Sequence, residues 1–348
     1  MENQDLAPFL DELGHSFLCC VRPRVHDAGA MWKAAVALGS VLSFVTLAAT
    51  GPSNPDRVTL ETSLRGKIGA FRGEMGLFAR NLETGEAVAV NADTRFPTAS
   101  VIKLAVLAET ERRLAEGTLA DDTTVTLRDA DKVGDGTPLN ALHGGTVLTV
   151  SDLVRLMIAW SDNTATNLLV GLVGTKSVNA LLDAHGLRQT RLYRPTFRDG
   201  RADVLPDEEK EFGLGSTTPR EAAALMERIS DGRIAGRAVS DRMIAVLATQ
   251  QDRSMIPRSL PFSNDAILVA NKTGWDEEKR PDARGFRGDV RGDVAFVKGP
   301  RGRYVLAILA RRISDKQPGV DNEALRTGAE LSRLVYDAFQ GGAGAPAR

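Results

Sequence analysis

The chain has 348 residues, of which 43% are hydrophobic and 26% are charged, as in globular proteins with one large or two medium domains. Its 44 basic and 45 acidic residues give a formal net charge of −1, and only 5% are aromatic, which argues against a nucleic-acid-binding protein. The two cysteines, Cys19 and Cys20, are adjacent and the four histidines are scattered, so we expect no disulfide framework, no metal site and no cofactor.

The first 50 residues contain a segment typical of export signals. Met31 and one basic residue precede a largely apolar run over residues 34–49, which is short for a membrane span and suits the core of a signal peptide. We predict that residues 1–30 are an extension before the true start, that residues 31–50 are a signal peptide, and that cleavage occurs near Ala49. The mature protein is then a monomer, secreted or periplasmic, without a stable membrane span. The alternative is an uncleaved N-terminal anchor on an outward-facing protein.

Hydrophobic periodicity predicts the elements of a single α/β domain over residues 55–340. The predicted helices cover, in chain order, residues 59–71, 100–116, 149–160, 164–173, 177–186, 217–229 and 322–339. A hairpin and three further strands cover residues 75–81, 86–93, 266–275, 292–299 and 303–313. The expected fold is a five-stranded, mostly antiparallel sheet flanked by helices, formed by residues of about 55–99 and 216–340. An all-helical lobe of about 100–215 is inserted into it.

The stretch "TASVIKLAVLAE" opens an apolar helix with a serine and then places a lysine within it. Ser100 and Lys103 are three residues apart, so they share one face of the predicted helix. A serine hydroxyl needs a base to become a nucleophile, and burial among aliphatic side chains favours a neutral lysine that accepts the proton. Backbone N–H groups at the start of the helix suit a developing oxyanion. We therefore take Ser100 as the candidate nucleophile and Lys103 as its base.

A second polar triplet, Ser161-Asp162-Asn163, lies between two predicted helices. Short polar side chains at such a turn point into a cleft. Ser161 is suited to passing protons, and Asn163 to binding an amide carbonyl or positioning Lys103. The same composition also fits simple helix capping.

A third triplet, Lys272-Thr273-Gly274, is placed by the pattern at the end of a strand. A lysine and a hydroxyl there suit a substrate carboxylate, and a glycine allows the backbone to approach a ligand closely. The N–H of Trp275 is a candidate second oxyanion donor beside that of Ser100.

Taken alone, the first motif, Ser100 and Lys103, also fits a helix start followed by a lysine whose side chain extends to the surface.

The three motifs together are far more specific than each alone. They occur in the order Ser-x-x-Lys, Ser-Asp-Asn, Lys-Thr-Gly, with gaps of 61 and 111 residues between their first residues. This set is a signature of class A β-lactamases and penicillin-binding proteins. Over residues of about 55–340 the chain resembles the class A β-lactamase family, also in the stretches "SDNTATNLL", "STTPREAA" and "RGDVAFV". The resemblance implies a β-lactamase/transpeptidase-like fold and an exported serine hydrolase acting on β-lactams or D-Ala-D-Ala-like compounds.

The resemblance also implies roles for the matching residues. Ser100 would form the acyl-enzyme and Lys103 would be its base or proton relay. Ser161 and Asn163 would serve proton transfer and substrate binding. The substrate carboxylate would be held by Lys272 and Thr273.

One departure from the family pattern concerns deacylation. Class A enzymes carry a Glu-x-x-Leu-Asn segment whose glutamate activates the deacylating water. In "TRLYRPTFRDG" the glutamate position falls at Pro195 or Thr196, and no Leu-Asn follows. We therefore expect intact acylation and slow deacylation, unless Asp199 or Asp203 of the long acidic segment replaces the missing base.

Three functions fit these features. The leading one is a β-lactamase-like serine hydrolase. The second is a penicillin-binding D-alanyl carboxypeptidase or an esterase on the same scaffold. The third is a binding or sensing protein that a β-lactam acylates once without turnover. The lifetime of the adduct with penicillin separates the first function from the third.

Overall fold

The computed structural model describes residues 55–341 except residues 135, 263–265 and 282. Within this part the main sheet has five strands, and every neighbouring pair is antiparallel. In spatial order the strands are β2 (Ala87–Val90), β1 (Glu74–Asn81), β10 (Gly302–Ile313), β9 (Asp289–Gly299) and β8 (Leu268–Glu277). The predicted sheet and its β1–β2 hairpin are thus confirmed. β8 is an edge strand, so one side of its backbone has no strand partner in this sheet.

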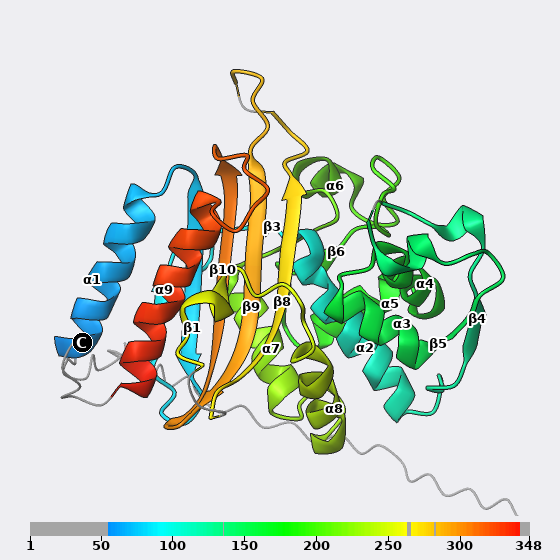
Figure 1. The fold of residues 1–348 in the computed structure, drawn as a ribbon, viewed down its shortest axis with the longest axis horizontal. Coiled ribbons are helices and arrows are strands. Elements are labelled where there is room, and N and C mark those ends of the chain that lie inside the picture. The colour runs from blue at the N-terminus through cyan, green and yellow to red at the C-terminus, as the bar shows by residue number, and fades with distance from the viewer. Residues whose placement is uncertain (1–54, 135, 263–265, 282, 342–348) are drawn as a thin grey trace, which may run out of the picture. The chain divides into compact units, whose positions relative to one another are not determined.

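One face of the sheet is covered by the first and last helices. α1 (Pro55–Ala70) and α9 (Glu323–Gln340) lie side by side against it (Figure 1). Leu60, Leu64 and Ile68 are spaced four apart on α1 and all are buried in this layer. Burial of such an apolar stripe, rather than helix propensity, is what stabilises a helix of this length.

The other face of the sheet packs against α7 and α8 and leads into the helical part of the chain (Figure 1). The helices there are α2 (Lys103–Ala115), α3 (Val150–Ala159), α4 (Asn163–Val173), α5 (Thr175–Ala184), α6 (Pro206–Phe212), α7 (Pro219–Ser230) and α8 (Arg237–Leu247). Alternate strand residues serve the two layers: Phe78 packs with the helical part and its neighbour Leu77 with α1 and α9. This alternation follows from the two-residue period of a strand.

The inserted lobe is not wholly helical, which corrects the sequence prediction. β4 (Thr124–Thr126) pairs with β5 (Val147–Thr149), and a second small sheet joins β3 (Phe96–Pro97), β7 (Gly215–Thr217) and β6 (Arg191–Leu192). Segments of two or three residues are too short to show a strand period in the sequence. They matter for function because β6 and β7 fix both ends of the loop that follows Leu192.

The ends of the helices that border the site follow ordinary capping chemistry. The Thr149 hydroxyl accepts from Asp152 N at 3.1 Å and starts α3, and Thr218 accepts from Glu221 N and starts α7. Such caps typically contribute about 1 kcal/mol each. These caps fix the residues at which α3 and α7 begin.

The predicted extension and signal peptide, residues 1–50, lie outside the described residues. Among the residues that are described, no helix is both long and apolar enough to cross a membrane.

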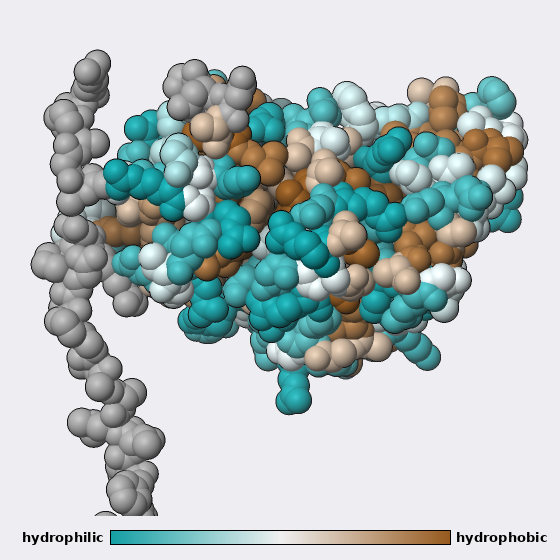
Figure 2. Space-filling view, turned by 90° about the horizontal axis from the view of Figure 1, so that it is seen from below, coloured by the Kyte–Doolittle hydropathy of each residue, from teal (hydrophilic) through white to brown (hydrophobic). Residues whose placement is uncertain are grey.

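On the face drawn in Figure 2, several separate hydrophobic areas lie among hydrophilic residues.

Candidate active site

Ser100 occupies the turn that leads into α2. The prediction began an α-helix at Ser100, whereas residues Ala99–Ile102 form a 3₁₀ turn and the α-helix begins at Lys103. Ala99 has a left-handed φ of +43°, and Val101 N donates to Thr98 O at 3.0 Å, which tightens the chain at this point. Ser100 lines a cavity of about 680 Å³.

Lys103 is fully buried and is held by three polar atoms. Its Nζ lies 2.6 Å from Ser161 O, 3.1 Å from Ser161 Oγ and 2.8 Å from Asn163 Oδ1. These contacts bring together the first and second motifs, as the sequence predicted. None of these three contacts of Lys103 Nζ involves the Ser100 hydroxyl. A direct hydrogen bond between Ser100 and Lys103 therefore stays a prediction.

The second motif lies between α3 and α4, where the sequence placed it. Ser161 has a left-handed φ of +56°, and Asp162 caps α4 by accepting from Ala165 N at 2.8 Å. The other carboxylate oxygen of Asp162 accepts from Leu139 N at 2.9 Å. Asp162 therefore has the capping role, and it fixes the turn that points Ser161 and Asn163 toward Lys103.

The third motif lies within β8 rather than at its end, which corrects the prediction. Trp275, Asp276 and Glu277 continue the pairing with β9, so the strand runs past Gly274. Lys272 is fully buried and its Nζ lies 3.1 Å from Ser161 Oγ and 2.7 Å from Thr273 O. The hydroxyl of Ser161 thus contacts both buried lysines.

Burial controls the charge of the two lysines. Loss of hydration, together with the nearby charge of Lys272, lowers the pKa of Lys103 well below its usual range, with a partial offset from Asp162. Loss of hydration also lowers the pKa of Lys272 to about 8, against the opposing effect of Asp293 and Asp252. Near neutral pH the arrangement favours a neutral Lys103 beside a charged Lys272. This is the assignment that a base and a carboxylate-binding group require.

Gly274 packs tightly against the Ser100 turn. A Cβ added there would lie 2.7 Å from Thr98 O, a distance that real Cβ atoms essentially never show, and 3.1 Å from Ser100 N. Glycine therefore lets β8 approach the Ser100 turn, whereas the sequence analysis expected it to admit a ligand. The next residue, Trp275, lines the same cavity as Ser100.

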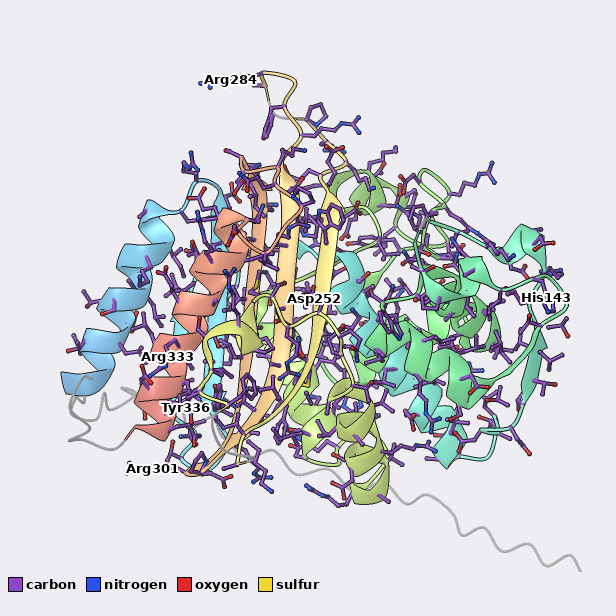
Figure 3. The ribbon with its side chains drawn as sticks, in the orientation of Figure 1. His143, Asp252, Arg284, Arg301, Arg333 and Tyr336 are labelled. Atoms are coloured by element: carbon purple, nitrogen blue, oxygen red, sulfur yellow. The ribbon has the colours of Figure 1, made fainter. Side chains whose placement is uncertain are left out.

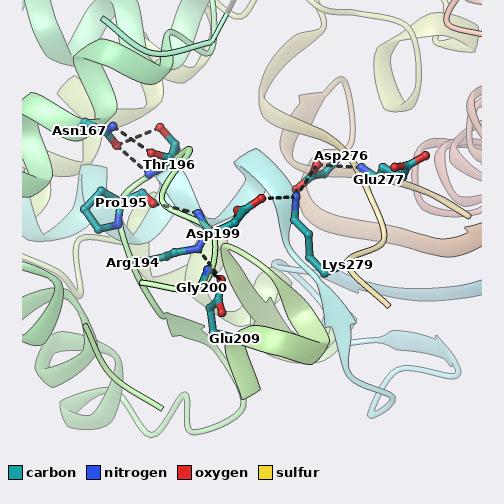
Figure 4. A network of polar contacts seen from close by, with 10 residues as sticks. All are labelled: Asn167, Arg194, Pro195, Thr196, Asp199, Gly200, Glu209, Asp276, Glu277 and Lys279. Carbon is teal, nitrogen blue, oxygen red and sulfur yellow. Dashed lines mark hydrogen bonds and ion pairs between the residues drawn. The ribbon is translucent and has the colours of Figure 1, made fainter. Parts of the chain in front are cut away.

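The loop after β6 carries Pro195 and Thr196, the two residues at which the glutamate position was expected. Thr196 Oγ1 lies 2.9 Å from Asn167 Oδ1 and 3.3 Å from Asn163 O, and the backbone N of Thr196 donates to Asn167 Oδ1 at 2.7 Å (Figure 4). Thr196 is buried and its side chain carries no group that ionises near neutral pH.

The two suggested substitute bases are engaged elsewhere. Asp199 pairs with Arg194 and lies 3.4 Å from Lys279, while Arg194 also binds the buried Glu209 at 2.7 Å (Figure 4). Asp203 accepts from Thr175 Oγ1 at 2.6 Å. Neither carboxylate is among the described residues that line the cavity.

The predicted site did not include two buried ionisable residues that lie behind the third motif. Arg291 and Asp293 lie on β9, opposite Trp275 and Thr273, and both are buried. Asp293 accepts from Asn271 Nδ2 and from the backbone N of Ile256, each at 2.9 Å. The available signal was the pair of charges inside the otherwise apolar strand sequence "VRGDVAFV".

Two further ionisable residues, Asp252 and His143, lie at very different distances from the cavity (Figure 3). Asp252 lies beside β8 and lines the Ser100 cavity, and it was also absent from the predicted site. His143 lies at the outer edge of the helical part, far from β8. It is exposed, and its Nδ1 lies 3.0 Å from Gly144 O, a local contact within its own loop.

Comparisons with known proteins agree with this geometry. A sequence model described as the β-lactamase enzyme family, Beta-lactamase2, matches residues 59–339. The chain is 35% identical to β-lactamase L2 of Stenotrophomonas maltophilia over 256 residues, which are 72% of this chain and 76% of that protein. It is 29% identical to β-lactamase AST-1 of Nocardia asteroides, over 82% of this chain and 84% of that protein.

Solved structures give the same answer. A β-lactamase from Sphaerobacter thermophilus superposes with a TM-score of 0.67 at 30% identity, covering 81% of this chain and 97% of that one. A mutant of PBP-A, solved as an acyl-enzyme complex with penicillin G, superposes with a TM-score of 0.67 at 26% identity over the same shares. The chain therefore belongs to the β-lactamase enzyme family and is a serine hydrolase of the class A β-lactamase type.

Proposed function

We propose that Ser100 opens the β-lactam ring by forming an acyl-enzyme, with Lys103 as its base. Ser100 Oγ bonds to the lactam carbonyl carbon and gives its proton to neutral Lys103. The C–N bond of the ring then breaks, and the lactam nitrogen takes a proton from Ser161. The 3.1 Å contact between Lys103 Nζ and Ser161 Oγ supplies the path that returns the proton to Ser161.

The remaining site residues bind the substrate in this proposal. The N–H groups of Ser100 and Trp275 stabilise the oxyanion, and Gly274 brings β8 close enough for both to face one oxygen. The amide of Asn163 binds the carbonyl of the acyl side chain. The substrate carboxylate is held by Lys272 and Thr273, since a buried ammonium beside a hydroxyl favours that charge.

One observation carries this proposal. Two buried lysines converge on the single hydroxyl of Ser161, and both Ser161 and Ser100 line a cavity of about 680 Å³. A structural lysine gains little from such burial, because its charge loses hydration and faces a second positive charge. Proton transfer gives this arrangement a use.

Deacylation is slow in this proposal. Water that attacks the acyl-enzyme ester needs a base, and the loop offers Pro195 and Thr196 where the family pattern has glutamate. The nearby carboxylates of Asp199 and Asp203 are bound to other groups. Losing one general base costs about 10²–10⁴-fold in rate.

The place of action follows from the N-terminal sequence. We propose export through the segment 31–50, cleavage near Ala49, and a monomeric periplasmic or secreted enzyme that binds no nucleic acid. N-terminal sequencing of the mature protein tests the cleavage. A mature chain that keeps residues 34–49 would support the anchored alternative.

Intact-mass spectrometry after addition of penicillin tests the reaction. We expect a covalent adduct on the wild-type protein that lasts minutes or longer and is missing in Ser100→Ala. An adduct that survives Ser100→Ala would refute the assigned nucleophile. Rapid steady turnover without a detectable adduct would refute slow deacylation and point to another base.

A further inference from the structure

Three exposed aromatic side chains gather around the reaction cavity. Trp160, Phe197 and Trp275 are 57%, 60% and 62% exposed, the highest values of any aromatic residue in the described part of the chain. All three line the cavity that contains Ser100. The next most exposed aromatic residue, Phe262, is 43% exposed and lies outside it. Exposed apolar groups concentrated in one concave site indicate a ligand surface rather than chance exposure.

Phe197 has an unfavourable backbone conformation. Its φ of +55° lies in the left-handed region, which bulky residues rarely adopt. Its ring packs against Gly134, where an added Cβ would lie 2.9 Å from two ring carbons. Strain of this kind persists where the surrounding structure fixes it, and it is common at functional sites.

The ring of Phe197 lies close to the group that is proposed to bind the substrate amide. The same Cβ position on Gly134 is 3.4 Å from Asn163 Nδ2, so the ring and the Asn163 amide border one glycine. An acyl side chain begins at the carbonyl that Asn163 binds. The group attached to that carbonyl therefore has Phe197 as its neighbour.

Trp275 provides a second aromatic surface from another element. It follows Gly274 on the edge strand β8, and the guanidinium of Arg291 lies 4.5 Å from the centre of its ring. Arg291 is buried, so it supports one face of the indole. The third ring, Trp160, ends α3 directly before Ser161. The three rings thus come from three separate segments around one cavity.

The charged residues of the cavity wall add a second restriction. Among the described residues, four carboxylates line it, against the single cation of Lys316: Asp252, Asp276, Glu277 and Asp289. Lys316 lies 2.6 Å from Glu277 and 3.3 Å from Asp289, Arg291 lies 3.2 Å from Asp289, and Lys279 lies 3.4 Å from Asp276. The one cation that lines the cavity is therefore already paired with carboxylates, so it is a poor partner for a negatively charged substrate side chain.

We propose that the site selects β-lactams whose acyl side chain carries a neutral aromatic ring, and that Phe197 is the residue that determines this specificity. The substrate ring stacks against Phe197, with Trp275 as the other apolar wall. The proposal rests on the proposed function, because the side chain is placed by an amide carbonyl at Asn163.

The test compares acylation of three penicillins that share one nucleus. Their side chains are phenylacetyl, an unbranched alkanoyl group of similar carbon number, and phenylmalonyl, which adds a carboxylate to the first. Second-order acylation constants are measured by quenched-flow mass spectrometry for the wild type and for Phe197→Leu. Phe197→Tyr is the conservative variant, and Phe262→Leu is the matched control outside the cavity.

We expect the wild type to prefer phenylacetyl over alkanoyl by roughly 2–12-fold, the range for one aromatic pair, and to disfavour phenylmalonyl. Phe197→Leu should bring the phenylacetyl-to-alkanoyl ratio close to one, while Phe197→Tyr and Phe262→Leu keep it. If Phe197→Leu leaves this ratio unchanged, or lowers the acylation constant equally for all three substrates, the specificity role of Phe197 is refuted. The proposed function is not affected by either result. If no penicillin acylates the wild type, the proposed function itself is wrong.

Discussion

Lys103 Nζ lies 2.8 Å from Asn163 Oδ1, so the proposed base and the proposed amide-binding residue are joined directly. Removing the amine should slow acylation by about 10²–10⁴-fold, since a general base typically contributes that factor. Rapid-quench mass spectrometry of Lys103→Ala with penicillin measures the rate.

The matched control for Lys103→Ala is Lys176→Ala, which removes an exposed lysine of α5. Its acylation rate should equal that of the wild type. Thermal unfolding must show that Lys103→Ala is folded. A folded Lys103→Ala protein that is acylated at the wild-type rate would make Lys103 a structural residue.

Acylation should also depend on the charge of Lys272 at alkaline pH. Burial lowers the pKa of Lys272 to about 8, so the ammonium is present below that pH and is lost above it. The second-order acylation constant should therefore fall as pH rises past 8. Lys272→Arg keeps its charge at every accessible pH, so its alkaline fall should move to higher pH.

A pH profile of Lys272→Arg with the same alkaline midpoint as the wild type would assign that midpoint to another group. The acid side of the profile is an internal control, because it reports protonation of the base. Lys272→Ala removes the positive charge that lowers the pKa of Lys103. Its acid limb should consequently shift to higher pH.

Much of the fold was predictable because its long elements carry clear periodicity. The sheet order places β1 beside β10, although these strands are far apart in the chain, and both show strong apolar runs. The strands β4 to β7 were not predictable, because two or three residues cannot show a period. The 3₁₀ turn at Ser100 was missed for a related reason, since it depends on the left-handed φ of Ala99.

The site was predictable where a motif named it and hidden where only the fold assembles it. Ser161 and Lys272 are 111 residues apart, and the motifs alone suggested that they meet. Arg291 and Asp293 come close to the site through strand pairing, and no local pattern shows which strands pair. Phe197 looked like an ordinary loop residue, because its exposure and its position beside Gly134 exist only in the folded chain.

The buried carboxyl of Asp293 should make stability depend on pH. Burial raises its pKa to about 7, against the hydrogen bonds from Asn271 and Ile256, while Asp252 raises it further and Lys272 lowers it. The unfolded value is about 3.9. Between these two values the folded state binds the proton more tightly, so this group makes stability fall as pH rises from about 4 to 7.

Asp293→Asn removes this titration. Urea unfolding of both proteins at pH 4.5, 6 and 7.5 should show that the wild type loses stability relative to the variant as pH rises. Comparing the two proteins at each pH cancels the other titrating groups. A difference in unfolding free energy that does not change with pH would show that Asp293 does not titrate in this interval.

The last prediction concerns the missing base of deacylation. Thr196 is fixed by two backbone-to-side-chain bonds with Asn167, and its hydroxyl lies 3.3 Å from the backbone O of Asn163, a residue that lines the cavity. A longer acidic side chain at this position would reach toward the acyl-enzyme from a backbone that is already in place. Thr196→Glu should therefore shorten the lifetime of the penicilloyl adduct by about 10²-fold or more, as expected for one added general base.

The control for Thr196→Glu is Thr196→Gln, which has the same shape without the basic oxygen pair. Its adduct should last as long as that of the wild type, and both variants should be acylated on Ser100. The measurement is the decay of the adduct mass after excess penicillin is removed. Equal acceleration by Gln and Glu would mean that the loop acts by admitting water rather than by removing its proton. An unchanged lifetime in Thr196→Glu would mean that position 196 does not face the ester, and the base must then be sought on another element.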